Sequence, residues 1–115
     1  MSPRNRSRAP ARLQAQAPAF AALGDETRLA LLSKLASGQP CSITQLTRGS
    51  RLTRQAITKH LRVLQRAGMV HSARMGRESR FEFNPQPMQA IQEYLDFVSE
   101  QWDQALGRLK SFVEK

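Results

Sequence analysis

The stretch LTRQAITKHLRVLQRAG at residues 52–68 has the pattern of a helix with one apolar side and one basic side. Its apolar residues Ile57, Leu61 and Leu64 are spaced by four and three positions, as on the buried face of an α-helix. Thr53 is a favoured N-cap residue and lies just before this pattern. The stretch therefore predicts a basic amphipathic helix that starts after Thr53.

A shorter helix is expected in the segment CSITQLTRGS, residues 41–50. Ser42 and Gln45 have the spacing of a capping box, in which each side chain bonds the backbone N–H of the other residue. Gly49 then interrupts the helical pattern. Two helices joined by a tight turn that contains glycine, the second of them basic, predict a helix-turn-helix.

A further helix is expected before this motif, within residues 18–37. Asp25 is its expected N-cap, and Gly38 followed by Pro40 ends it. Its apolar positions are Leu29, Leu32, Leu35 and Ala36.

The period of the pattern changes after the basic helix. Residues 69–74 and 79–83 are rich in β-forming residues, and Phe81 and Phe83 alternate with polar neighbours. Gly76 lies between the two segments and permits the positive φ of a hairpin turn. We expect a mainly α fold with a small two-stranded β wing, that is, a winged helix-turn-helix.

A long helix is expected from Met88 to the end of the chain. Its apolar residues recur every three or four positions and form a stripe that a domain of this size cannot cover alone. A second copy of the chain would cover it. The expected dimer interface comprises Phe20, Leu23, Leu95, Val98, Trp102, Leu106 and Leu109.

The chain carries a formal net charge of +9 over 115 residues, which points to a polyanionic partner such as nucleic acid. The basic excess lies in residues 1–16 and 41–80, whereas residues 81–115 are acidic. We divide the single domain into a basic disordered arm (1–16), a DNA-binding winged helix-turn-helix (17–86) and a C-terminal dimerisation helix (87–115). With no signal peptide and no membrane span expected, a cytoplasmic protein is the default.

The order of these elements resembles the ArsR-type, or arsenic-repressor-like, family of winged-helix transcriptional regulators. The motifs that carry the resemblance are ALGDETRLALLSKL (22–35), LTRQAITKHLRVLQRAGMV (52–70) and GRESRFEFNP (76–85). The resemblance implies a homodimer that binds an operator in double-stranded DNA and represses transcription until a signal releases it.

The sequence departs from the metal-sensing members of that family. The segment SITQLTR contains no cysteine, and residues 87–115 contain no histidine. Cys41, His60 and His71 are too few and too scattered for a metal site, so we expect a non-metal-sensing branch with no metal and no cofactor. The inducer is unknown: a small molecule, oxidation of Cys41, a protein partner or concentration alone all remain open.

The second helix of a helix-turn-helix presents its first residues to base edges in the major groove. We therefore expect Arg54 to read guanine, Gln55 to read adenine, and Thr58 to contact a thymine methyl group or a phosphate. Farther along the helix and in the wing, the residues expected at phosphates or in the minor groove are Lys59, His60, Arg62, Arg74, Arg77 and Arg80.

Two other classes of function are compatible with a basic winged helix. A winged helix also serves as a protein-interaction adaptor or as a shape-specific RNA-binding module. Such modules have no need for Arg54, Gln55 and Thr58 in the first turns of the basic helix, so DNA binding is favoured. No histidine or cysteine is placed as an activated nucleophile, so an enzyme is not expected.

Overall fold

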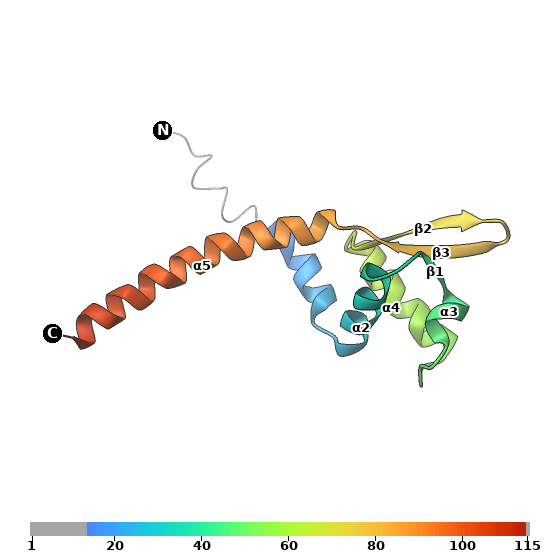
Figure 1. Ribbon diagram of the computed structural model, residues 1–115, viewed down its shortest axis with the longest axis horizontal. Helices are drawn as coiled ribbons and strands as arrows, with labels where there is room; N and C mark the ends of the chain where they lie inside the picture. The colour runs from blue at the N-terminus through green and yellow to red at the C-terminus, as the bar shows by residue number, and fades with distance from the viewer. Residues whose placement is uncertain (1–13, 115) are drawn as a thin grey trace.

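The computed structural model describes residues 14–114 of the chain (Figure 1). Residues 14–23 are helical and are followed by α2 (Glu26–Ala36), α3 (Ile43–Thr47) and α4 (Arg54–Arg66). Three strands, β1 (Cys41–Ser42), β2 (Val70–Met75) and β3 (Glu78–Phe83), form one sheet, and α5 (Gln86–Val113) ends the described chain. The wing and α5 extend from opposite ends of the molecule (Figure 1).

Side-chain caps start the helices at the positions that the sequence predicts. The Asp25 carboxylate accepts a hydrogen bond from the Arg28 backbone N–H at 3.0 Å, and the Thr53 hydroxyl accepts one from Ala56 at 3.1 Å. Ser42 and Gln45 form the complete capping box. Each cap satisfies backbone donors that would otherwise lack partners at the start of a helix, so these boundaries are fixed locally.

The hydrophobic core lies where α4 packs against α2, α3 and the base of β2. Ile57, Leu61 and Leu64 are buried on α4, as their spacing predicts. On α2 the buried residues are Leu31, Leu32 and Leu35, whereas Leu29 is 49% exposed. Of the apolar positions expected on this helix, Leu32 and Leu35 are therefore buried, whereas Leu29 and Ala36 are exposed.

The wing is larger than predicted, because the sheet has three antiparallel strands in the order β1-β3-β2. Cys41 pairs with Phe81 and Ser42 with Arg80, on the side of β3 away from β2. Cys41 and Ser42 thus lie in a strand at the point where the sequence predicted only the start of a helix. Ser42 serves both elements, since it also caps α3.

Residues 14–16 are helical, although the sequence analysis assigned them to a disordered arm; residues 1–13 of that arm lie outside the described residues. The helix over residues 14–23 is held by tertiary contacts. Ala19 and Ala22 are buried, and the Phe20 ring lies 5.9 Å from that of Tyr94 on α5 in an edge-to-face arrangement. The Arg28 guanidinium donates to the Ala22 carbonyl at 2.6 Å and so satisfies an orphan acceptor at the end of this helix.

Candidate nucleic-acid interface

The surface of α4 opposite its buried residues is basic and open to solvent. Gln55, Lys59 and Arg62 lie on this side and are exposed. Helical geometry places them there: at about 100° per residue, these three positions lie roughly 140–200° round the helix from Ile57. A single surface depression joins the residues Arg54, Gln55, Thr58, Lys59 and Arg62.

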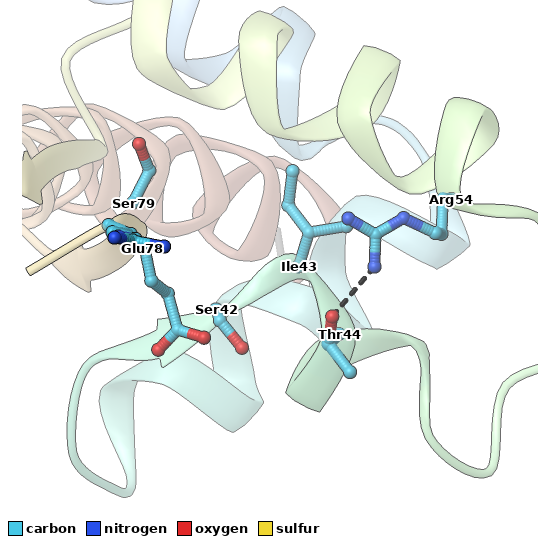
Figure 2. Close-up of a pocket in the computed structure, with 7 residues that line it drawn as sticks. Ser42, Ile43, Thr44, Arg54, Glu78 and Ser79 are labelled. Atoms are coloured by element: carbon cyan, nitrogen blue, oxygen red, sulfur yellow. Dashed lines mark hydrogen bonds between the residues drawn. The ribbon is translucent and has the colours of Figure 1, made fainter.

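Arg54 and His60 lie on the two flanks of α4, and each faces a neighbouring helix. The Arg54 guanidinium donates a hydrogen bond to the Thr44 hydroxyl on α3 at 2.7 Å (Figure 2). The Thr58 hydroxyl donates to the Arg54 carbonyl at 2.7 Å, so its methyl group is the part left to face a partner. Arg54 is thus fixed against the first helix of the motif, and Gln55 is the residue of the first turn that points directly outward.

His60 faces the start of α2. Its Nδ1 lies 3.7 Å from an Asp25 carboxylate oxygen and 3.5 Å from an Arg28 guanidinium nitrogen, and its side chain is 24% exposed. The hydrogen bond from the backbone N–H of Arg28 lowers the pKa of Asp25, and the positive charge of Arg28 lowers it further. This position on the α2 side of α4 separates His60 from the surface that Lys59 and Arg62 form.

The three wing arginines do not share one face. The register of β2 and β3 pairs Arg74 with Ser79 and Ala73 with Arg80, so Arg74 and Arg80 point to opposite sides of the hairpin. Arg80 donates to the Glu78 carboxylate at 3.0 Å, whereas Arg77 follows Gly76 in the turn and is exposed. Gly76 has a φ of 68°, as expected for this turn.

A pocket of about 340 Å³ lies where α3, α4 and the wing meet (Figure 2). Its lining includes Thr44 and Ser79, which the sequence analysis did not single out. Thr44 is ten residues from Arg54, and no cap or periodic pattern marks it; the two side chains meet because α3 and α4 pack together. The other lining residues are Ser42, Ile43, Arg54, Arg77 and Glu78.

The expected dimer residues fall into two groups. Phe20 and Leu23 are partly buried against the core of their own subunit. On α5 the residues Leu95, Trp102, Leu106 and Leu109 are 48%, 68%, 59% and 57% exposed, and Val98 is half-buried. The far end of α5 therefore carries apolar side chains that no other part of residues 14–114 covers.

Within residues 14–114, no three histidine, cysteine or carboxylate side chains are grouped as they would be at a metal ion. No helix in the same range is long and apolar enough to cross a membrane.

Comparison with known proteins agrees with this geometry. A family model described as a helix-turn-helix domain matches residues 23–73, which run from the end of the first helix into β2. An uncharacterized HTH-type transcriptional regulator of Bacillus subtilis, YuzN, is 40% identical over 78 residues, which cover 63% of this chain and 85% of the relative.

The HTH-type transcriptional regulator Rv2034 of Mycobacterium tuberculosis is 33% identical over 96 residues, which cover 84% of this chain and 86% of the relative. Among solved structures, an ArsR-like transcriptional regulator from Rhodococcus sp. RHA1 has a TM-score of 0.75 and 34% identity, with 86% of this chain and 92% of that chain covered.

The fold and the site define a winged helix-turn-helix protein in which the basic α4 is the second helix of the motif. The matches to the regulators from Mycobacterium tuberculosis and Rhodococcus cover 84% and 86% of this chain, which is more than the helix-turn-helix alone. The chain belongs to the ArsR-like family of DNA-binding transcriptional regulators.

Proposed function

We propose that this regulator represses transcription as a homodimer on an inverted-repeat operator. The observation that carries the proposal is the basic depression on α4, where Arg54, Gln55, Thr58, Lys59 and Arg62 lie together at the outward side of the recognition helix. An α-helix fits the major groove of B-DNA, and its first turns reach the base edges there.

The residues on α4 divide by chemistry. The Gln55 amide is both donor and acceptor, so it matches the edge of an adenine, and the Thr58 methyl group suits a thymine. Lys59 and Arg62 lie farther along the helix and meet phosphates, which set the position of the protein on the duplex. His60 acts indirectly, because its contact with Asp25 orients α4 on α2.

The wing arginines contact the DNA beside the major groove. Arg77 in the turn enters the minor groove, and Arg74 and Arg80, on opposite sides of the hairpin, face the two flanking backbones. This arrangement requires the hairpin to insert its turn into the groove, with each of its two faces toward one backbone.

The apolar stripe of α5 supports the homodimer. A twofold pair buries the same residues on both subunits and presents two recognition helices one DNA turn apart, about 34–36 Å. An operator with inverted-repeat symmetry follows from that symmetry. A dimer bound across a promoter in the cytoplasm would exclude RNA polymerase, which is why we propose repression; no catalytic step is assigned.

Selection from a random-sequence duplex pool tests the proposal. The full-length protein should enrich an inverted repeat, and its affinity for the selected duplex should exceed that for a scrambled duplex by about a thousandfold. The variant Gln55→Ala should lose about 1–3 kcal/mol on the selected duplex and little on the scrambled one, whereas Lys59→Ala should weaken both. Selection of no sequence, or equal losses from the two variants on both duplexes, would contradict the assigned roles.

A further inference from the structure

Arg54 is not free to act as an isolated base-reading side chain. It is the first residue of α4, and its guanidinium donates to the Thr44 hydroxyl on α3 at 2.7 Å (Figure 2). Position 54 lies about 60° round the helix from the buried Ile57, whereas position 55 lies roughly opposite it. The hydrogen bond uses one terminal nitrogen of the guanidinium and holds the group beside α3, about 100° round the helix from position 55.

The pocket beside this hydrogen bond has the composition of a binding site for an anion such as a phosphate group. Arg54 and Arg77 bring two guanidinium groups to it from α4 and from the wing. Thr44 and Ser79 add hydroxyl groups from α3 and β3, and both residues are exposed. Guanidinium and hydroxyl donors from separate elements that line one pocket match the oxygens of a phosphate group.

One carboxylate, that of Glu78, also lines the pocket, and its negative charge would oppose the binding of an anion. Glu78 accepts a hydrogen bond from the Arg80 guanidinium at 3.0 Å, so its negative charge is compensated within the wing. Arg54 and Arg77 remain as positive groups with no carboxylate partner within salt-bridge distance among the described residues. The net charge of the pocket and its immediate neighbours is therefore positive.

We infer that this pocket holds one phosphate of the DNA backbone, and that Arg54 is a phosphate-binding residue that positions α4 and does not read guanine. The inference rests on the proposed function, because it assumes that α4 lies in the major groove. In the first turns of α4, Gln55 and Thr58 are then the residues that contact base edges and so discriminate between DNA sequences. In this arrangement Arg77 binds the phosphate, which replaces its proposed role in the minor groove. The wing and the helix-turn-helix then contact the same phosphate, which fixes the angle between them on the duplex.

Binding to the selected duplex and to a scrambled duplex, measured from 50 to 300 mM salt, distinguishes the two roles of Arg54. Arg54→Ala should weaken binding to both duplexes by the same factor, about 10- to 100-fold, and should reduce the slope of log K against log salt by about 0.9. Thr44→Val replaces the hydroxyl with a methyl group of similar size. It should give a smaller loss of affinity, again by the same factor on both duplexes. Gln55→Ala is the matched control, with its loss confined to the selected duplex.

A methylphosphonate scan locates the phosphate. Each duplex in the scan carries one uncharged linkage, and one position should weaken the wild-type protein without weakening Arg54→Ala any further. A loss in Arg54→Ala that is confined to the selected duplex, with relaxed preference at one base pair on reselection, would overturn the inference. So would a scan in which every position affects the two proteins equally.

The two proposals fail separately. If the wild-type protein selects no sequence, the proposed operator recognition is wrong. A weaker affinity and a reduced salt slope of Arg54→Ala on random DNA would still support the phosphate pocket.

Discussion

Replacing Trp102 with alanine should weaken the dimer more than any other single change on α5. Trp102 is 68% exposed in one subunit and lies on the same stripe as Leu106 and Leu109, which are 59% and 57% exposed. If these side chains form the seam between two subunits, the tryptophan is the largest group that the seam covers.

The magnitude follows from the exposed area. A large aromatic side chain buries up to about 250 Å² when fully covered, so with 68% of it exposed roughly 170 Å² is available to a partner. At about 25 cal/mol per Å², complete coverage would be worth ~4 kcal/mol per subunit. With half of that area covered in each of two subunits, Trp102→Ala should destabilise the dimer by about 4 kcal/mol, or ~1000-fold in Kd.

Sedimentation equilibrium over a range of protein concentrations measures this change directly. Gln104→Ala is the control, because position 104 is exposed and lies about 200° round α5 from position 102. The control should leave the dimerisation constant unchanged, and circular dichroism should show the same helix content in both variants. An unchanged Kd for Trp102→Ala would remove this side chain from the interface and refute the argument from exposure.

Two further predictions concern stability. Because the pKa of Asp25 is lowered in the folded state, the ionised carboxylate contributes stability above its unfolded pKa, and this contribution is lost as the pH falls through the folded value. Asp25→Asn keeps a capping side chain without the charge, so urea unfolding at pH 6 and pH 3 should show a smaller acid destabilisation than in the wild type; identical pH dependence would contradict this role. Gly76 has a φ of 68°, so Gly76→Ala should cost about 1 kcal/mol in a thermal melt, whereas Gly107→Ala within α5 should stabilise by up to ~1 kcal/mol. Equal effects of the two glycine substitutions would show that the turn does not require the positive φ.

The elements that could be predicted from the sequence are those fixed by local interactions. Asp25, Ser42 and Thr53 each accept a hydrogen bond from a backbone N–H three residues away, so their roles as caps are visible in the sequence. The buried face of α4 follows in the same way from the spacing of Ile57 and its successors.

The elements that were missed depend on contacts between distant segments. β1 consists of two residues, and it exists because Cys41 and Ser42 pair with β3 some forty positions later. The helix over residues 14–23 has Pro18 within it, and most of its apolar residues are alanines; it is stabilised by burial of Ala19 and Ala22. No periodic pattern in the sequence encodes either contact.

The same distinction applies to the candidate interface. Gln55, Lys59 and Arg62 are exposed where helical periodicity places them, opposite Ile57. The orientation of Arg54 depends on Thr44, and that of His60 depends on Asp25. Residues on the flanks of a recognition helix therefore take their roles from the helices packed beside it.

The junction between β3 and α5 connects the long helix to the helix-turn-helix. The Asn84 side chain donates to the Gly68 carbonyl at 2.8 Å, and its backbone N–H donates to the Met69 carbonyl at 2.9 Å. These bonds fasten the start of α5 to the end of α4. In a dimer paired along α5, a slip of one helical turn would displace each α4 by about 5.4 Å. In such a dimer the packing of α5 would set the half-site spacing of the operator.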